Sequence, residues 1–363
     1  MAKKKPLEQL KEALEELEEA VESVESALDN RIEANLSTGA AMLDLAISGE
    51  VGKAFGPGHY TLYVGDSGSG KTFLLLTMFA EAAANPFYDD YKLIYVCSEN
   101  GAQMDFERFF GSKVANRVEI ERPDTLEAMY DLLDGLAEKD QKYIVIVDSA
   151  DGLKTEASKA LNKENRKKRE AGKETGKSYD MGHAKIHSGR LPDVIHDLGR
   201  LGCILAIIAQ TRDNVNAGLF EDDKTRSGGH ALKFYAHSEV WLSCGAAIKR
   251  TANGKEREIG RVANCKVKKN RVNGKARAVK VSILPEFGID DTGSMFEWLV
   301  EEKFLESKGG RYASPWYDKT YTKEELIRKM EDDDRIDELK SFVQEKWDAI
   351  ESELRVERKP RYQ

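Results

Sequence analysis

The stretch from Tyr63 to Thr72 constrains the fold of this chain most, because an apolar run breaks into glycines and then resumes as Phe73-Leu74-Leu75-Leu76. Four residues separate Gly65 from Gly70-Lys71-Thr72, which is the G-x-x-x-x-G-K-[ST] spacing. Such glycines let successive backbone N–H groups point at one phosphate, and the positive end of the following helix faces the same anion. The pattern therefore predicts a strand, a phosphate-binding loop and a helix, in preference to an ordinary glycine turn.

The chemistry of phosphate binding assigns roles within this stretch. Lys71 is predicted to bridge the outer phosphates of ATP, and the Thr72 hydroxyl is predicted to be a ligand of Mg²⁺. The residues predicted to surround the nucleotide are Gly65, Asp66, Ser67, Gly68, Ser69, Gly70, Lys71, Thr72 and Phe73.

Strand-like and helical segments alternate from Thr61 onward, which is typical of a parallel sheet covered by helices on both faces. The sequence thus predicts an α/β fold with a mostly parallel twisted sheet. Strands that end in polar residues are predicted at 92–97, 142–147 and 203–209. In open α/β sheets ligands bind beyond the carboxyl ends of the strands, so these polar residues should converge on the nucleotide.

Each polar strand end has a predicted task. Asp148 follows an apolar run and should hold the water shell of Mg²⁺. Glu99 is predicted to polarise the attacking water. Gln210 is predicted to sense the γ-phosphate and to report to the segment that follows it.

Two long polar segments are predicted to be loops beyond the strand ends. Residues 156–178 are rich in Lys and Arg, and their positive charge suits contact with a phosphate backbone, although a merely solvated charged loop is nearly as well supported. Residues 211–227 carry neither a strand nor a helix pattern. Loops this long inside a compact domain are usually functional.

The remaining segments suggest smaller units. Apolar residues spaced three and four apart over 7–28 predict a helix, which either pairs with a neighbour or packs on its own domain. Alternating strands at 262–267 and 278–283 flank Asn273-Gly274, a hairpin signal. The predicted units are an N-terminal helix (1–34), an ATPase core (35–288), a small α/β domain (289–350) and a basic tail (351–363).

Composition limits the classes of protein to consider. No apolar run is long enough to cross a bilayer, and the basic start leads into charged heptads, so a cytoplasmic location without membrane contact is expected. Four cysteines lie far apart, which is not the pattern of a disulfide framework or a metal site. A net charge of −8 argues against an all-over nucleic-acid coat but leaves room for local basic surfaces.

Several motifs together resemble the RecA recombinases. The segment from Gln210 to Ala236, which contains Gly228-Gly229-His230-Ala231-Leu232-Lys233-Phe234-Tyr235-Ala236, is similar to the second DNA-binding loop of that family and the signature that closes it. Ser98-Glu99, Val147-Asp148-Ser149, Lys269-Asn270-Arg271 and Gly288-Ile289-Asp290 follow in the family's order. The resemblance covers roughly residues 35–345.

The resemblance implies further roles. Glu99 matches the catalytic glutamate, Phe106 matches the aromatic residue that stacks on adenine, and Gln210 matches the switch between ATP and the DNA loop. Lys269 and Arg271 match basic residues that reach the γ-phosphate of the neighbouring protomer, at an interface that also holds Phe234. With DNA loops at 156–182 and 211–227, the implied DNA contacts are Lys167, Lys168, Arg169, Gly182, Arg212, Phe220, Lys224, Arg226, Gly228 and Gly229.

The chain also departs from the family pattern. The first loop is longer and more basic than usual, and the second carries the acids Glu221-Asp222-Asp223. Arg271 replaces a lysine, and the tail is basic where many relatives end acidic. These departures concern how DNA is held and whether full strand exchange is supported, and they leave the nucleotide residues intact.

The expected function is a DNA-dependent ATPase that uses ATP and Mg²⁺, forms a helical filament on single-stranded DNA and exchanges strands with double-stranded DNA. Single-strand-binding and mediator proteins are possible partners. Two alternatives stay open: a hexameric helicase or translocase built on the same core, and an ATP-binding recombination mediator that does not exchange strands.

Overall fold

The computed structural model describes residues 34–98, 104–172, 174, 182–213 and 224–358. Its strands are β1 (Tyr60–Gly65), β2 (Lys92–Cys97), β3 (Val118–Glu121), β4 (Tyr143–Asp148), β5 (Ile204–Asp213), β6 (Lys224–Arg226), β7 (Ser238–Ala252), β8 (Lys255–Asn270), β9 (Ala278–Leu284) and β10 (Gly288–Asp290). Among the described residues these form one sheet in the order β10-β9-β8-β7-β1-β5-β4-β2-β3, with β6 paired to β5. Strands β7, β1, β5, β4, β2 and β3 are parallel, and β8, β9 and β10 continue the sheet in antiparallel pairs.

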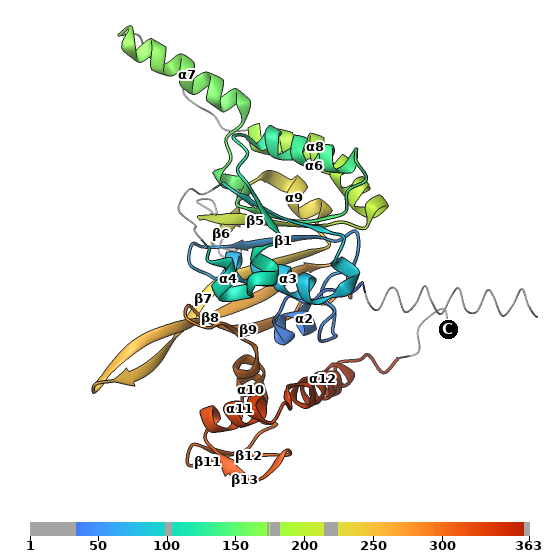
Figure 1. The fold of residues 1–363 in the computed structure, drawn as a ribbon, viewed down its shortest axis with the longest axis vertical. Coiled ribbons are helices and arrows are strands. Elements are labelled where there is room, and N and C mark those ends of the chain that lie inside the picture. The colour runs from blue at the N-terminus through green and yellow to red at the C-terminus, as the bar shows by residue number, and fades with distance from the viewer. Residues whose placement is uncertain (1–33, 99–103, 173, 175–181, 214–223, 359–363) are drawn as a thin grey trace, which may run out of the picture.

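Helices cover both faces of this sheet, as Figure 1 shows. The helices of this part are α2 (Ala41–Ile47), α3 (Lys71–Ala84), α4 (Phe106–Phe110), α5 (Ser112–Ala115), α6 (Leu126–Ala137), α8 (Gly182–Leu201) and α9 (Gly229–Tyr235). Because neighbouring side chains of a strand point to opposite faces, Leu62 and Val64 pack in one apolar core with α6 and α8, whereas Tyr63 packs in another with α2 and α3. The predicted α/β fold, with a mostly parallel sheet between helices, is confirmed.

The longest strands form a hairpin that the sequence analysis recognised only in part. Strands β7 and β8 pair in antiparallel fashion from Ser238 opposite Asn270 to Ala252 opposite Lys255. Their outer ends project from the body of the molecule (Figure 1). The turn is Asn253-Gly254, and both residues have positive φ, 52° and 70°, as a two-residue hairpin loop of this twist requires. The second hairpin, β8 with β9 around Asn273-Gly274, is confirmed.

The prediction of a loop over residues 156–178 was wrong for its first 15 residues, because Glu156–Glu170 form helix α7. The Thr155 side chain caps it by accepting a hydrogen bond from the Ser158 N–H, and ion pairs such as Lys168–Glu164 run along it at i,i+4 spacing. Asn165 is the one buried residue of this helix, so no apolar stripe exists for a pattern search to find. Figure 1 shows α7 projecting from the top of the molecule.

A second, small sheet lies near the C-terminus. Its strands are β11 (Ser307–Lys308), β12 (Arg311–Ser314) and β13 (Tyr317–Tyr321), accompanied by α10 (Asp291–Glu301), α11 (Lys323–Asp332) and α12 (Ile336–Glu353). Side chains of these helices, such as Phe296 and Leu339, join the same core as α2 and α3. The domain boundary after residue 288 therefore stays a proposal, and α12 continues past the predicted start of the basic tail at residue 351. The predicted N-terminal helix falls, apart from residue 34, outside the described residues.

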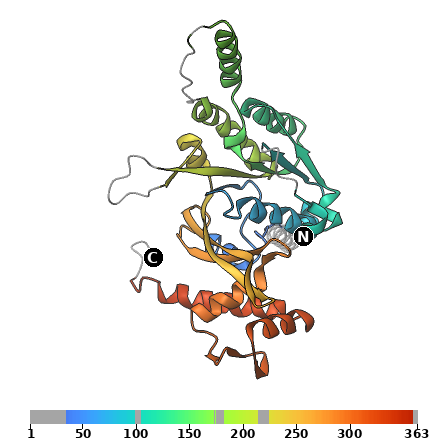
Figure 2. The ribbon, with the colours of Figure 1, turned by 90° about the vertical axis from the view of Figure 1, so that its left-hand side faces the viewer.

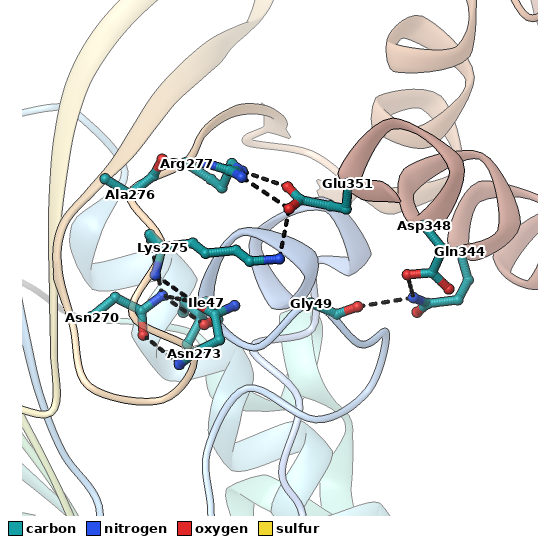
Figure 3. A network of polar contacts seen from close by, with 10 residues as sticks. All are labelled: Ile47, Gly49, Asn270, Asn273, Lys275, Ala276, Arg277, Gln344, Asp348 and Glu351. Carbon is teal, nitrogen blue, oxygen red and sulfur yellow. Dashed lines mark hydrogen bonds and ion pairs between the residues drawn. The ribbon is translucent and has the colours of Figure 1, made fainter. Parts of the chain in front are cut away.

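Helix α12 is fixed to the core by a polar network, drawn in Figure 3. Glu351 accepts hydrogen bonds from the Lys275 Nζ at 2.7 Å and the Arg277 Nη2 at 2.9 Å. Gln344, two turns earlier, donates to the Gly49 carbonyl at 2.8 Å and accepts from the Val51 N–H at 2.9 Å. The helix thus holds both the turn between β8 and β9 and the chain that leads from α2 to β1.

We expect Glu351→Gln to lower the free energy of unfolding by about 2 kcal/mol at pH 7. The hydrogen bond from Arg277 lowers the pKa of Glu351 from 4.5 to about 2, so the carboxylate stabilises the fold fully above pH 4.5, and this contribution is lost as the pH falls towards 2. Urea unfolding of wild type and variant between pH 7 and pH 2 should show a difference that shrinks steadily below pH 5. Glu353→Gln is the control, because Glu353 lies two residues further along α12 and is exposed. Equal losses of unfolding free energy in the two variants would contradict the stabilising role given to Glu351.

Candidate functional site

The predicted phosphate loop connects β1 to α3 and has the backbone geometry that glycine allows. Gly68 and Gly70 have φ of 75° and 91°, in the left-handed region. A Cβ on Gly70 would lie 2.4 Å from the Ile283 Cδ1, and a Cβ on Gly65 would lie 2.4 Å from the Leu242 carbonyl oxygen. Only glycine fits these positions, because the loop curls tightly between β7 and β9 before α3 begins at Lys71.

Lys71 is buried and is held within this loop. Its Nζ donates hydrogen bonds to the Gly65 carbonyl at 2.8 Å and to the Asp66 carbonyl at 2.6 Å. Ser69 closes the loop from the other side, since its Oγ donates to the Asp66 carbonyl at 2.8 Å. The ammonium charge and the N-terminus of the 14-residue helix α3 therefore meet at one place, which is the arrangement that attracts a polyphosphate.

Thr72 and Asp148 lie together although 76 residues separate them. The Thr72 Oγ1 donates to the Asp148 Oδ2 at 2.6 Å, and the Tyr95 hydroxyl donates to the same oxygen at 3.1 Å. Burial, followed by the charge of Asp148, raises the pKa of Tyr95, so the phenol remains a donor. A hydroxyl and a carboxylate side by side are oxygen donors of the kind that Mg²⁺ prefers, so these two residues fit the predicted magnesium site.

Gln210 lies beside the phosphate loop because of the strand register. In the parallel pairing of β1 with β5, Gly65 stands opposite Gln210. The Gln210 backbone N–H donates to the Asp151 Oδ2 at 2.7 Å. Strand β5 continues past Gln210 to Asp213, so the predicted loop 211–227 in fact begins and ends as a short ladder of β5 with β6. Glu99, the predicted water-polarising residue, lies outside the described residues.

Asp66 joins the phosphate loop to this ladder. Its carboxylate accepts hydrogen bonds from the Thr211 hydroxyl on β5 and from the Lys224 ammonium on β6. The hydrogen bond from Lys224 lowers the pKa of Asp66. Because both partners belong to the segment predicted to hold DNA, one side chain of the phosphate loop contacts both strands at the base of that segment.

Lys269 and Arg271 lie away from the phosphate loop of their own chain. Lys269 stands opposite Glu239 on β7, and Glu239 stands opposite Leu62 on β1. Leu62 lies three residues before Gly65, which is about 10 Å along the strand. The Lys269 Nζ donates to the Lys233 and Phe234 carbonyls at 2.5 and 2.7 Å.

The guanidinium of Arg271 lies on the same side. It donates to the Phe234 carbonyl at 2.9 Å and lies 5.9 Å from the centre of the Phe234 ring, which is 63% exposed. Burial, and then the charge of Arg271, lower the pKa of Lys269 to about 8. Two cations and an exposed aromatic ring therefore share one surface, which we call the cationic face (Phe234, Lys269 and Arg271).

Some of the predicted DNA contacts lie on exposed elements, whereas others lie inside the fold. Lys167, Lys168 and Arg169 lie on the projecting helix α7, and Arg212 is exposed on β5. Figure 2 shows α7 at the top of the molecule and the β5–β6 ribbon extending from its side. By contrast, Arg226 points inward, and Gly182 begins helix α8.

Two glycines carry a conformational requirement at the start of α9. Gly228 and Gly229 have φ of 82° and 77°, and a Cβ on Gly229 would lie 2.7 Å from the Ala184 Cβ. Phe220, predicted to contact DNA, lies outside the described residues.

The two aromatic residues predicted near the nucleotide, Phe106 and Phe73, both pack against other aromatic rings. Phe106, 8% exposed, lies with its ring centre 6.0 Å from that of Tyr95. Phe73, in the first turn of α3, lies 5.2 Å from Phe109 and 5.4 Å from Phe110. Stacking of Phe106 on adenine stays a prediction, since in this structure its ring is covered by protein.

Comparisons with known proteins show which family the chain is similar to. The family described as the RecA N-terminal domain matches residues 8–290. Protein RecA of Laribacter hongkongensis is 28% identical over 287 residues, which is 77% of this chain and 72% of the relative. Protein RecA of Trichodesmium erythraeum is 26% identical over 82% of this chain and 75% of its own length, and that of Nostoc punctiforme is 26% identical over 88% and 81%.

No helix in the described part of the chain is long and apolar enough to cross a membrane. The sheet order, the phosphate loop, and the segment from Gln210 to Ala236 all fall within the matched residues, and the match spans well over half of the chain. This chain belongs to the RecA family.

Proposed function

We propose that this protein is a DNA-dependent ATPase that assembles on single-stranded DNA and promotes homologous pairing and strand exchange with double-stranded DNA. The observation that carries the proposal is the link between the phosphate loop and the β5–β6 ladder. Gln210 stands opposite Gly65, and Asp66 bonds to Thr211 and Lys224 at the base of the segment proposed to hold DNA. A change at the phosphates is therefore transmitted directly to that segment.

The nucleotide chemistry rests on residues that already stand together. Lys71 would neutralise the outer phosphates of ATP, while Thr72 and Asp148 would hold Mg²⁺. When bound, Mg²⁺ neutralises charge on the phosphates during their transfer. Glu99 is proposed to orient and polarise the attacking water, and Gln210 to respond to the γ-phosphate.

The cationic face supports a head-to-tail assembly. Because it lies away from the chain's own phosphate loop, Lys269 and Arg271 are proposed to reach the γ-phosphate held by a neighbouring protomer. A heterologous interface that does not close generates a helical filament instead of a ring. Hydrolysis of ATP between protomers would then loosen the filament and release DNA. A cytoplasmic location, and single-strand-binding or mediator proteins as partners, stay proposals.

ATP hydrolysis measured with and without single-stranded DNA, over a salt series, tests this function. We expect strong stimulation by DNA that fades as salt rises, because phosphate contacts release counterions. Lys71→Ala provides the blank. Turnover that is indifferent to DNA would contradict the proposal and favour a motor or mediator with another activator, and ring-shaped particles in negative-stain microscopy would favour the hexameric helicase.

A further inference from the structure

Glu239 is a carboxylate buried inside the sheet, on strand β7. The residue is 1% exposed. Its Oε1 accepts a hydrogen bond from the Arg226 Nε at 3.0 Å, and its Oε2 lies 3.7 Å from the Lys233 Nζ. The Arg226 side chain is itself 9% exposed. This carboxylate is thus buried and is paired with one buried cation, Arg226, and one cation at the surface, Lys233.

Stability alone explains this pair poorly. Burying a carboxylate carries a desolvation penalty, and apolar residues of similar volume often stabilise a core as well as a buried ion pair does. Moreover, Glu239 Oε2 has no hydrogen-bond donor within the described residues, so the attraction of its neighbours offsets that penalty only in part. A pair of this kind is better understood as a device that fixes one arrangement of the segments that supply it.

The segments around Glu239 are those that the proposed function has to connect. Arg226 ends β6 and pairs with Thr211 across the ladder at the base of the proposed DNA segment. Its Nη1 also donates to the Gly229 carbonyl at the start of α9, the helix that carries Lys233 and Phe234 (Figure 1).

Lys269, on strand β8, also lies next to Glu239. It stands directly opposite Glu239 in the β7–β8 ladder, so both side chains lie on one face of the sheet. Its Nζ donates to the carbonyls of Lys233 and Phe234 at the end of α9. The charge of Glu239 raises the pKa of Lys269 against the effects of burial and of Arg271, which helps to keep this lysine protonated.

We propose that Glu239 is a positioning residue that couples the DNA segment to the cationic face, through Arg226 on one side and through α9 and Lys269 on the other. The proposal rests on the proposed function. When DNA binds at the β5–β6 ladder, Arg226 and the start of α9 are drawn into one position, because Arg226 donates both to Glu239 and to the Gly229 carbonyl. Lys269 and Phe234 are then held in the arrangement that meets the next protomer.

The test replaces Glu239 by glutamine, which keeps an oxygen for Arg226 but removes the charge. In Glu239→Gln we expect the stimulation of ATP hydrolysis by single-stranded DNA to fall by about 10-fold, while basal turnover and the affinity for a fluorescent ATP analogue stay within about 2-fold of wild type. Because Arg226 is itself among the predicted DNA contacts, the double variant Arg226→Gln/Glu239→Gln is compared with Arg226→Gln alone, and adding Glu239→Gln should lower the stimulation no further, because the two residues act as one unit. Glu256→Gln, whose partner Lys249 lies on the exposed part of the same hairpin, is the matched control.

The outcomes separate the two proposals. If wild type is not stimulated by DNA, the proposed function fails, and this inference fails with it. If wild type is stimulated and Glu239→Gln is stimulated equally, this inference alone is overturned. A parallel fall in basal turnover, nucleotide affinity and thermal midpoint would show a merely structural role and would also overturn it. If Glu239→Gln does not fold, the double variant Arg226→Met/Glu239→Leu leaves no unpaired buried charge and should fold with its DNA stimulation lost.

Discussion

Replacement of Lys71 by alanine should lower ATP turnover by at least about 100-fold, because a charge placed at the developing negative phosphates is among the largest contributions to such a reaction. In this structure the Lys71 ammonium lies inside the loop that should hold those phosphates, bound to the Gly65 and Asp66 carbonyls. ATP hydrolysis in the presence of saturating single-stranded DNA is the measurement, together with titration of a fluorescent ATP analogue to separate binding from turnover.

Lys92→Ala is the matched control for this variant. Lys92 lies on β2 and forms an exposed ion pair with Glu119, so its loss should leave turnover and stability close to wild type. Lys71→Ala should also keep its fold, because the loop glycines that shape the backbone remain in place. Turnover in Lys71→Ala within a few-fold of wild type would show that this loop is not the site of hydrolysis, whatever else it binds.

The parts of this site that the sequence predicted are those encoded by short-range patterns. The spacing from Gly65 to Thr72 sets a strand, a loop and a helix within a few residues, and the structure has all three. Asp148 and Gln210 were placed near the loop because parallel strands bring their carboxyl ends to one edge, and the contact with Thr72 and the register with Gly65 agree with that expectation.

Other parts depend on partners far away in the chain, and these were missed. Tyr95 lies within an apolar strand, and nothing in its own sequence neighbourhood shows that its hydroxyl meets Asp148 from the neighbouring strand. Glu239 would be expected on a solvent face, because a lone acid in a strand is normally exposed. Its burial follows from its pairing with Arg226, which helix α9 separates from it in the chain, so the pair is visible only in three dimensions.

Helix α7 and the outer part of the β7–β8 hairpin were not predicted, for a different reason. Neither segment buries an apolar face over its full length, so hydrophobic periodicity, the main signal of secondary structure, is missing. Local chemistry did carry the information: Thr155 is a capping residue, and Asn253-Gly254 is the same turn dipeptide that correctly located the hairpin at Asn273-Gly274. Where a segment leaves the core, caps and turns are therefore the features of the sequence that indicate its structure.

The double variant Lys269→Ala/Arg271→Ala should lower DNA-stimulated ATP turnover by about 1,000-fold, the lower end of the effect of an arginine finger. We expect nucleotide binding by the isolated chain to change little, because the cationic face lies about 10 Å along the strand from its own phosphate loop. We expect removal of the two side chains to leave the fold intact, since their described hydrogen-bond partners are main-chain carbonyls at the end of α9.

Mixing the two inactive proteins distinguishes a site shared between protomers from a site within one chain. In a random equal mixture of Lys71→Ala and Lys269→Ala/Arg271→Ala, about a quarter of head-to-tail contacts pair an intact phosphate loop with an intact cationic face. Turnover should therefore recover to about a quarter of wild type, and sedimentation should show that the mixed chains assemble. A mixture of Lys71→Ala with Asp148→Asn, both altered on the phosphate side, should stay inactive. If the first mixture assembles but stays inactive, Lys269 and Arg271 do not act on a neighbour. A site built within one chain cannot be restored by mixing, because every chain in the mixture lacks either Lys71 or the Lys269–Arg271 pair.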